Sequence, residues 1–566
     1  MTAGPAASAP DRCGTPTTAI HQIQSADSHS PLAGQTVSIE GIVTYTANHK
    51  DSFNGFYIQQ ADAETDNNPA TSEALFVYTH HTATPGQRLR LTGSVKEFHD
   101  LTELVNVRHL IVCGQEPLPE PVKLSLPWQH APESLENMRV SFVTPLTVIE
   151  HHNLARYGEL TLAKEDQIIP TEYLKPGTRA VAQAGINREH RVLLDDGQST
   201  HNPIPVPWLQ LGNDNTVRAG DKVTGLSGVL DYRFGQWRLQ PEQRPHFSRP
   251  EPRPAAPPKP SGDAIRIMAL NLQNYFNGDG EHGGYPTPRG ASNLQAHNHQ
   301  LRRLTTAIRL AAPDIVAVTE LENDGDDPRS SLAQLTRTLG PSWRFIKTPD
   351  RDGSDAIRTA LLFRYDRVRP EGNALRLNKD IYQHRGRPPL SQTFSPVTGG
   401  KSVRVVVPHL KSKSCRNADG PDLDQHDGQG CFSTYRTREA RAITRWLSSL
   451  STPDNFAGTL ITGDLNSYAL ETPLVTFRQA GYTSLVHHFH PCTPDSCRYH
   501  SYRYQGEKGS LDYALATQVL IPHVMAATIW NINADEPRAL NYQSAPDLSG
   551  PWRASDHNPV ITDLQL

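Results

Sequence analysis

The chain has 566 residues, of which 36% are hydrophobic and 20% are charged, and its formal net charge is -4. This composition excludes intrinsic disorder and predicts a folded protein of three or four domains at about 150 residues each. The charge excludes a generally basic nucleic-acid coat, but it is compatible with local basic patches and with metal-bridged phosphate binding.

The sequence contains no run of 18 apolar residues, so we predict no transmembrane segment. Residues 1–10 are small and polar and lack an apolar stretch, which predicts that this chain carries no signal peptide itself, although a cleaved one is compatible with the sequence.

The first part of the chain is β-rich. Residues 13–116 are predicted to form one all-β domain, with strands at 36–44, 56–59 and 88–95 that mostly alternate apolar and polar side chains. Glycine and proline separate these strands. A second β-rich domain is predicted over 117–240, with strands at 138–144, 191–194 and 221–230.

A proline-rich stretch follows. Eight prolines lie between positions 241 and 260, and they predict an extended, polyproline-like linker over 241–262. After the linker, apolar runs typical of buried strands alternate with helical periodicity at 296–312 and 435–450. Residues 263–566 are therefore predicted to form an α/β domain.

The six cysteines form three groups in the sequence. Cys13 and Cys113 bracket the first β domain, and each remaining pair spans a short loop: Cys415 with Cys431 and Cys492 with Cys497. An even number in local pairs predicts three disulfides and an oxidising compartment, the alternative being six free thiols in a cytosolic protein. The acidic, glycine-rich stretch between Cys415 and Cys431 is a candidate structural Ca²⁺ site or, more simply, a solvated disulfide loop.

Short polar clusters recur through the last 300 or so residues, most of them just after an apolar run. Each alone has an ordinary structural explanation, such as a turn residue or a helix cap. Their number and order indicate a site where loops meet at the end of a sheet. The polar residues are Asn271, Glu320, His409, Asp464, Asn466, Asp512, Asp556 and His557.

These residue types suit hydrolysis of a phosphodiester, which requires an activated water, neutralised phosphorane charge and a stabilised leaving alkoxide. Asn271, Glu320 and Asp556 offer hard oxygen ligands for Mg²⁺ or Mn²⁺. Asp464 and Asn466, two apart on an extended segment, point the same way.

The same clusters resemble the sequence blocks of the endonuclease/exonuclease/phosphatase family. The resemblance covers residues 264–566, and it implies an α/β/β/α sandwich of four layers with two mixed sheets. The matching motifs are Ala269-Leu270-Asn271, Thr319-Glu320, Pro408-His409-Leu410-Lys411-Ser412-Lys413, Gly463-Asp464-Leu465-Asn466, Ser510-Leu511-Asp512-Tyr513 and Ser555-Asp556-His557.

Within that family the chain is most similar to bacterial secreted or surface-attached nucleases. Shared local features include Arg387-Pro388-Pro389-Leu390 and Asn533-Ala534-Asp535-Glu536-Pro537. The first β domain resembles, through Asn54-Gly55-Phe56-Tyr57-Ile58-Gln59 and Thr92-Gly93-Ser94-Val95, the oligonucleotide/oligosaccharide-binding (OB)-like domain often fused upstream of such nucleases.

The resemblance implies a role for each site residue. Asn271, Glu320 and Asp556 would hold the divalent metal, while Asp464 and Asn466 would position or deprotonate the water and contact the phosphate. Which group acts as acid and which as base stays open.

The remaining implied roles concern the phosphate. His557, paired with Asp512, would stabilise or protonate the transition state, and His409 would contact the scissile phosphate. Further candidate phosphate contacts are Arg358, Lys411 and Lys413.

We therefore expect an extracellular, periplasmic or cell-surface nuclease that depends on Mg²⁺ or Mn²⁺. It is expected to act on DNA, with RNA as a further candidate substrate, and to need no obligate protein partner. Two alternatives remain. One is a phosphodiesterase of the same fold acting on a phospholipid head group or a nucleotide. The other is a non-catalytic extracellular nucleic-acid-binding protein, which the completeness of the polar clusters disfavours.

Overall fold

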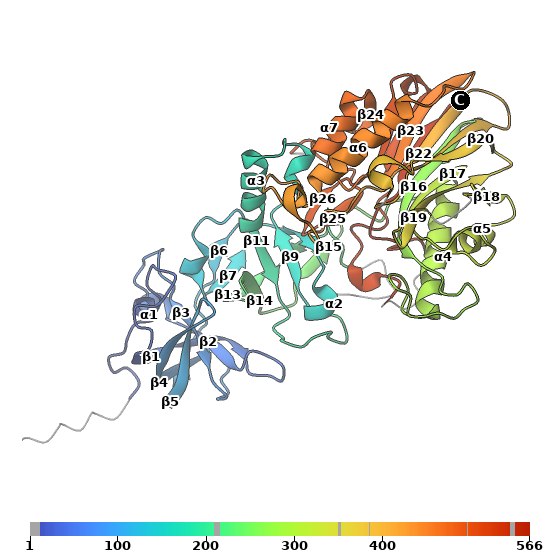
Figure 1. Cartoon of the computed structure of the whole chain (residues 1–566). Helices are drawn as coiled ribbons and strands as arrows, with labels where there is room; N and C mark the ends of the chain where they lie inside the picture. The colour runs from blue at the N-terminus through green and yellow to red at the C-terminus, as the bar shows by residue number, and fades with distance from the viewer. Residues whose placement is uncertain (1–11, 209–215, 349–351, 384, 495, 544–548) are drawn as a thin grey trace, which may run out of the picture. The chain divides into compact units, whose positions relative to one another are not determined.

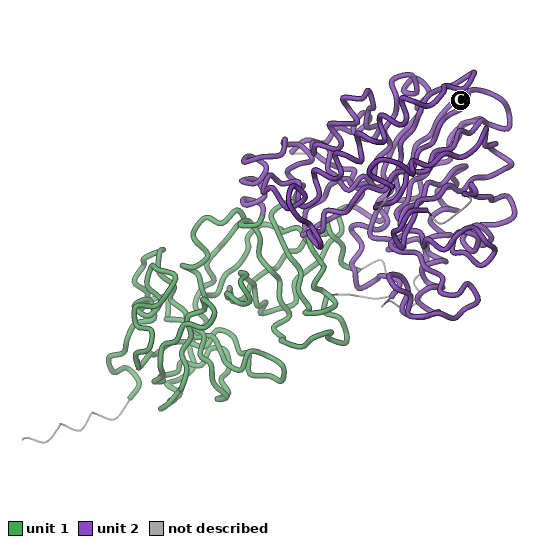
Figure 2. Tube along the Cα trace, in the orientation of Figure 1, with its two compact units in different colours: residues 1–166, 188–250 green, residues 167–187, 251–566 purple. Residues whose placement is uncertain are grey.

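The chain passes three times between two units in the computed structural model, which describes residues 12–208, 216–348, 352–383, 385–494, 496–543 and 549–566. Unit 1 comprises residues 1–166 and 188–250, and unit 2 comprises residues 167–187 and 251–566 (Figure 2). The segment 167–187 thus belongs to unit 2, although unit 1 flanks it in the sequence.

Unit 1 begins with a closed five-stranded barrel (Figure 1). Its interior is filled by aliphatic and aromatic side chains, among them Ile39, Phe56 and Leu91, and Ile20 of α1 (Ile20–Gln24) packs on the same core. The strands predicted at 36–44, 56–59 and 88–95 all lie in this barrel. In barrel order its strands are β1 (Thr36–Ala47), β2 (Gly55–Gln59), β3 (Ala74–Tyr78), β5 (Leu101–Gln115) and β4 (Gln87–Phe98).

The three predicted disulfides are present and pair Cys13 with Cys113, Cys415 with Cys431, and Cys492 with Cys497. The first ties the start of the described chain to β5 across a sequence separation of 100 residues, whereas the third closes a separation of 5. Three disulfides are typical of proteins that fold in an oxidising environment.

Loss of the long-range disulfide is expected to destabilise the protein more than loss of the shortest one. A disulfide that closes a loop of about 100 residues raises the free energy of the unfolded chain by about 4.7 kcal/mol, against about 2 kcal/mol for a loop of five residues. Urea unfolding of the Cys13→Ser/Cys113→Ser and Cys492→Ser/Cys497→Ser proteins would measure both losses. Equal losses in the two variants would contradict the loop-length argument.

The rest of unit 1 is a nine-stranded sheet with a core that includes Leu146, Leu162 and Leu230. The single strand predicted at 221–230 is two strands here, because the chain turns at Gly225 with a φ of 68°. In sheet order the strands are β15 (His246–Ser248), β12 (Lys222–Thr224), β8 (Leu146–Glu150), β9 (Leu160–Ala163), β11 (Arg191–Leu194), β14 (Gln236–Pro241), β13 (Ser227–Arg233), β7 (Arg139–Phe142) and β6 (Val122–Leu124), and α2 (Leu154–Tyr157) joins β8 to β9.

The proline-rich stretch is not a free linker over its predicted length of 241–262. Its first part contains β15, which pairs with β12, and its second part is bonded to unit 2. Arg266 donates to the carbonyls of Pro257 and Pro258, and Trp530 donates to the carbonyl of Pro254. Proline lacks an N–H donor but keeps its carbonyl acceptor, so a proline-rich chain can still be held by its neighbours' donors.

Unit 2 contains two six-stranded sheets (Figure 1). The first has the order β18 (Trp343–Phe345), β19 (Ile357–Arg364), β17 (Ile315–Glu322), β16 (Ile265–Tyr275), β29 (Val560–Leu564) and β28 (Val524–Ile529). The second has the order β20 (Val368–Arg376), β21 (Leu390–Pro396), β22 (Ser402–Val407), β23 (Phe456–Asp464), β27 (Asp512–Thr517) and β24 (Tyr482–Ser484).

The central strands of the two sheets of unit 2, such as β16 and β22, are apolar on both faces because both faces are buried. On β16, Ile267 and Ala269 join a core shared with the second sheet, whereas Met268 and Leu270 join a core shared with helices α4 (Leu294–Ala311) and α5 (Ser331–Leu339). The second sheet likewise packs its outer face on α6 (Ser433–Ser448) and α7 (Thr472–Gln479).

The helices predicted at 296–312 and 435–450 are α4 and α6 with slightly shifted ends. Asn293 caps α4 by accepting from the amide of Ala296, and Ser330 caps α5 by accepting from the amide of Ala333. The helices of unit 2 are α3 (Thr178–Glu189, whose last residues reach unit 1), α4 (Leu294–Ala311), α5 (Ser331–Leu339), α6 (Ser433–Ser448), α7 (Thr472–Gln479) and α8 (Leu485–Phe489). A small three-stranded sheet has the order β10 (Gln167–Ile168), β26 (Glu507–Gly509) and β25 (Tyr502–Tyr504).

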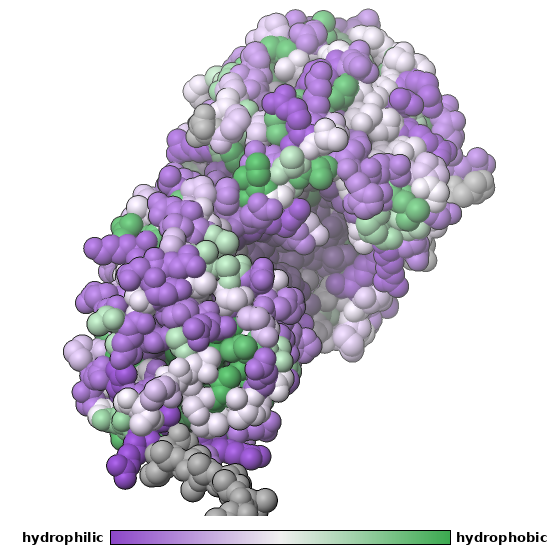
Figure 3. Space-filling model, turned by 90° about the vertical axis from the view of Figure 1, so that its left-hand side faces the viewer, coloured by the Kyte–Doolittle hydropathy of each residue, from purple (hydrophilic) through white to green (hydrophobic). Residues whose placement is uncertain are grey.

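The face of the molecule drawn in Figure 3 is mostly hydrophilic, with hydrophobic residues in small separate groups. Scattered exposed apolar side chains of this kind are normal for a protein surface. Among the described residues, no helix combines the length and the apolar character that crossing a bilayer requires.

Candidate active site

Polar side chains from both sheets of unit 2 meet at one edge of the domain. β17 and β23 carry Glu320 and Asp464 at or near their carboxyl ends, and β27 starts beside the end of β23 because the two strands are antiparallel, which pairs Asp512 with Asp464. By the same logic β29 starts beside β16, so the segment that precedes β29 brings in His557.

A bulge aims two of these side chains. The pairing of β16 with β17 runs to Asn271 opposite Thr319 and resumes only at Tyr275, leaving three residues of β16 against Glu320 alone. Glu320 has a φ of 55°, in the left-handed region. Bulges and left-handed non-glycine residues cost energy and often re-aim functional side chains. Here they bring the Asn271 Nδ2 to 3.1 Å from Glu320 Oε1.

Asp464 lies at the centre of the cluster and is 1% exposed. Its Oδ2 accepts from Asn271 Nδ2 at 3.1 Å and lies 3.4 Å from His409 Nε2, while its Oδ1 accepts from the Asn466 amide at 2.8 Å. Gly463 makes this approach feasible, since a Cβ there would lie 2.5 Å from the carbonyl oxygen of Pro408. Four of the predicted residues are thus joined through one carboxylate.

His557 and Asp512 form a buried pair, with Asp512 Oδ2 2.7 Å from Nδ1 of the imidazole. Asp512 is held in turn by its own backbone, because Ser501 Oγ accepts from the amides of Leu511 and Asp512 at 2.9 Å each. A carboxylate on Nδ1 fixes the tautomer and leaves Nε2 as the nitrogen that can meet a substrate.

The electrostatics of the cluster are those of crowded carboxylates around two imidazoles. Burial, and then Asp512, raises the pKa of Asp464 to about 7. Burial and the charge of Asp556 raise the pKa of Glu320. Burial alone would lower the pKa of His557, but Asp512 outweighs it and raises the pKa well above the ordinary value. The excess of negative charge is what a bound divalent cation would relieve.

The donor set fits a hard divalent cation. The ligand atoms of Glu320, His409 and Asp464 lie within 4.8 Å of one another, and so do those of Asp464, Asp512 and His557. Carboxylate and amide oxygens are the ligands that Mg²⁺ and Mn²⁺ prefer. Asp556, whose charge acts on Glu320, would add a further oxygen at this place.

The loop that carries Asp556 and His557 is fixed by Asn558, which is 1% exposed. Its Oδ1 accepts from the amides of Ile532, Asn533 and Ala534 at 2.8–3.1 Å. Its Nδ2 donates at 3.0 Å to the carbonyl of His500 and to Asn531.

Replacing this amide is expected to destabilise the protein. Asn558→Ala would leave the buried N–H groups of Asn533 and Ala534 without an acceptor and would leave that of Ile532 only the carbonyl of Trp530. This should cost about 3 kcal/mol of unfolding free energy and lower activity as the loop relaxes. Denaturant unfolding would measure the cost, with the exposed Asn373→Ala as the matched control. An unfolding free energy equal to that of the control would contradict this role for Asn558.

Each of the candidate phosphate-binding cations has a partner within the protein. Arg358 is 1% exposed, and its guanidinium is bonded to Asp326 at 2.8 Å and Asp352 at 3.1 Å. The ammonium of Lys413 lies 2.6 and 2.7 Å from the two oxygens of Glu471. Lys411 is half-buried with its ammonium 4.5 Å from the centre of the Phe432 ring. Their predicted role in substrate binding stays a prediction.

Two residues near the cluster were not singled out from the sequence. Arg387, 8% exposed, donates to the carbonyls of His409 and Leu410 and so holds the backbone of that segment. The ring of Tyr502 lies 4.6 Å from that of His557. Arg387 belongs to the motif Arg387-Pro388-Pro389-Leu390, which was a usable signal, whereas nothing in the local sequence marks Tyr502.

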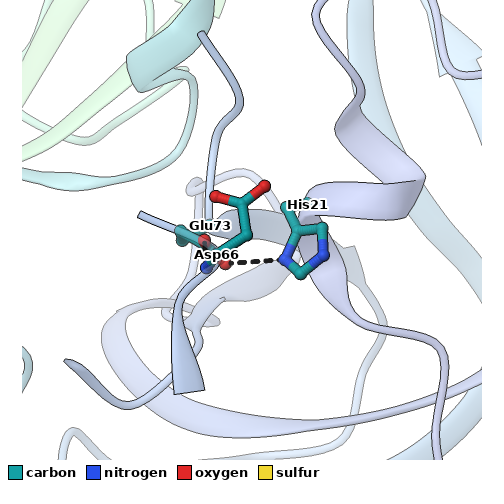
Figure 4. Close-up of side chains that lie close together, drawn as sticks. All are labelled: His21, Asp66 and Glu73. Atoms are coloured by element: carbon teal, nitrogen blue, oxygen red, sulfur yellow. Dashed lines mark hydrogen bonds and ion pairs between the residues drawn. The ribbon is translucent and has the colours of Figure 1, made fainter. Parts of the chain in front are cut away.

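Another group of ligand types lies in unit 1, where His21 Nδ1 is 3.4 Å from Glu73 Oε2 and Asp66 lies beside them (Figure 4). Glu73 Oε1 also accepts from the amide of Asp66, and the Asp66 carboxylate accepts from Asn68 and Thr71. These bonds account for the group as a hydrogen-bonded loop. In the predicted Ca²⁺ loop, Asp427 accepts from the amide and side chain of Gln429, and the Ca²⁺ hypothesis stays a prediction.

The geometry above defines a class of protein: a hydrolase with a carboxylate-rich site suited to a divalent metal and to phosphate esters. Comparison with known families agrees. The endonuclease/exonuclease/phosphatase family matches residues 270–557, just over half of the chain, and a domain of unknown function (DUF8508) matches residues 131–250. The chain therefore belongs to the endonuclease/exonuclease/phosphatase family, whose members are hydrolases that generally use divalent metals.

Several solved structures are similar to part of this chain. A humanized TDP2 of D. rerio shares 14% identity over 54% of this chain and 100% of its own, with a TM-score of 0.37. A family member from Bacteroides vulgatus shares 16% over 54% and 99%, with a TM-score of 0.35. A mannosyl-6-phosphatase of Bacteroides thetaiotaomicron shares 13% over 53% and 100%, with a TM-score of 0.35. No curated protein matches the chain.

Proposed function

We propose that this protein is a secreted, divalent-metal-dependent nuclease that cuts phosphodiester bonds within extracellular DNA, with RNA as a second substrate. The observation that carries the proposal is the meeting of Asp464 with the Asp512–His557 pair beside the carboxylate of Glu320. The three disulfides support an extracellular or cell-surface site of action.

The proposal extends to the architecture. We infer that unit 2 is a four-layer α/β/β/α sandwich, since its two sheets share one core and each packs its other face on its own helices. We infer that the five-stranded closed barrel of unit 1 is OB-like.

In the proposed reaction a water oxygen attacks phosphorus and the bond to the leaving sugar oxygen breaks. A divalent metal held by Asn271, Glu320 and Asp556 would neutralise charge on the phosphate when bound. Asp464, oriented by Asn271 and the Asn466 backbone amide, would accept the proton of the attacking water.

The imidazoles face the phosphate in this scheme. His557 is oriented through Nδ1 by Asp512, which leaves Nε2 to stabilise the pentavalent phosphate or to protonate the leaving oxygen. His409 is 3% exposed, and its buried Nδ1 has no hydrogen-bond partner within the described part of the chain. In this scheme its imidazole would contact the scissile phosphate.

Supercoiled plasmid tests the proposal with the purified protein, Mg²⁺ or Mn²⁺, and an EDTA control. Nicked and then linear plasmid that disappears with EDTA is the expected result. Intact plasmid with degraded linear duplex would replace the endonuclease with an exonuclease. Faster hydrolysis of a phospholipid head group or a nucleotide than of DNA would overturn the nuclease proposal.

A further inference from the structure

The segment Gln167–Asn187 is a part of unit 2 that lies outside the residues matched by the hydrolase family. Its strand β10 pairs in parallel with β26, with Gln167 opposite Glu507 and Ile168 opposite Lys508, and the Ile169 amide donates to the carbonyl of Lys508. The segment therefore extends the small sheet that directly precedes Asp512 in the chain.

Glu172 is the central side chain of the segment. Its carboxylate is fully buried, and its two oxygens accept from different loops, from the Ala469 amide at 2.9 Å and the Ser510 amide at 3.1 Å. His487 Nε2 lies 3.4 Å away. Ala469 follows Asn466 by three residues, and Ser510 precedes Asp512 by two. One carboxylate thus joins the two loops that carry Asp464 with Asn466 and Asp512.

The neighbouring Thr171 reinforces the first of these loops. Its carbonyl accepts from the Leu470 amide at 3.0 Å, and its hydroxyl donates to Glu471 at 3.0 Å. Glu471 in turn holds the Lys413 ammonium, so the segment is connected to the stretch that follows His409.

An apolar contact reinforces the second loop. Ile169 packs with Tyr468 and Leu511 in a small buried cluster, against which Tyr502 also packs. Leu511 is adjacent to Asp512, and the ring of Tyr502 lies 4.6 Å from the ring of His557. Tyr468 and Leu511 thus lie within two residues of Asn466 and Asp512, and the ring of Tyr502 is tilted against that of His557.

We propose that Glu172 is a positioning residue of the hydrolytic site, which fixes the loops of Asp464 and Asp512 relative to each other from a segment outside the family's own sequence. The inference rests on the proposed function, because a site of this kind needs its groups held within about half an ångström. Burying a carboxylate costs free energy. The two backbone amides offset that cost while both loops lie where they can donate to Glu172.

Glu172→Gln tests the proposal in the full chain. The carboxamide keeps one acceptor but turns an NH₂ group toward the second amide, so one loop is released without creating a cavity. We expect kcat for DNA cleavage to fall about tenfold with KM changed less than twofold, since the loops act on the transition state more than on binding. Glu165→Gln, which changes an exposed glutamate seven residues earlier, is the matched control and should cleave as the wild type does.

Two further measurements separate positioning from a general loss of stability. In an Asn466→Ala background, Glu172→Gln should lower kcat by clearly less than tenfold, because both changes act on the relative placement of the same two loops. Amide hydrogen exchange should become about tenfold faster at Ala469 or at Ser510, whichever amide meets the NH₂ group, and both should stay unchanged in Glu165→Gln.

An unchanged kcat in Glu172→Gln, or a tenfold loss that persists in full in the Asn466→Ala background, would overturn the inference while leaving the wild-type nuclease activity, and so the proposed function, intact. Unchanged exchange at both amides would overturn it as well. A wild-type protein that hydrolyses neither DNA, RNA nor bis(p-nitrophenyl) phosphate with Mg²⁺ or Mn²⁺ would overturn the proposed function, and this inference with it.

Discussion

Asp464→Asn is expected to lower kcat for DNA cleavage by about a thousandfold, since one neutral amide would replace the carboxylate to which Asn271, His409 and the Asn466 amide all point. The substitution keeps the side-chain shape, so the fold should persist. The proton acceptor for the attacking water is lost. An NH₂ group also replaces one of the two Asp464 oxygens, so that a donor faces Asn271 Nδ2 or the Asn466 backbone N–H.

Steady-state cleavage of a defined DNA duplex at saturating Mn²⁺ or Mg²⁺ measures this loss, and thermal unfolding checks the fold. Asp366→Asn is the matched control, because Asp366 pairs with Arg364 at the surface of the same unit, with a side chain that is 40% exposed. Cleavage by Asp464→Asn within tenfold of the control would remove Asp464 from the proposed chemistry.

His557→Ala is expected to lower kcat by about a thousandfold, and Asp512→Asn by at least a hundredfold. The two effects should not add, because Asp512 acts on the substrate through the imidazole whose Nδ1 it holds at 2.7 Å, even though its charge also raises the pKa of Asp464. The double variant should therefore be no slower than His557→Ala alone.

Single-turnover cleavage rates of the two single variants and the double variant give the coupling free energy between Asp512 and His557. If the losses multiply, Asp512 has a role of its own, and the pair is not the functional unit proposed here. The Asn558→Ala protein is a useful comparison, since it disturbs the loop of His557 without removing either partner.

The positions of the site residues were predictable from local pattern. A polar residue that ends a run such as Leu460 to Gly463 must lie at the end of a buried strand, and strand ends of one sheet meet at one edge. That logic located Asn271, Glu320 and Asp464 before any contact was known. The family resemblance added the roles, and the family match over residues 270–557 confirms the membership.

The surroundings of the site were not predictable, because they depend on which distant segments fold together. Lys413 lies close after His409 in the sequence, yet its ammonium forms an ion pair with Glu471. Arg358 forms ion pairs with two aspartates. A cation's partner is set by the nearest buried carboxylate, which no local pattern encodes.

The sequence by itself determined the order of the elements, the three disulfide pairs and the polar groups that end the strands of unit 2, since apolar periodicity and cysteine spacing are local signals. Only the tertiary structure decided that the bulge opposite Glu320 aims its carboxylate at Asn271, and that Glu172, from a stretch between two β strands of unit 1, reaches the loops of Asp464 and Asp512. The Asn271–Glu320 contact joins residues 49 positions apart, and the two Glu172 contacts join residues 297 and 338 positions apart. Their free energy comes from burying paired polar groups, which exists only once the chain has folded.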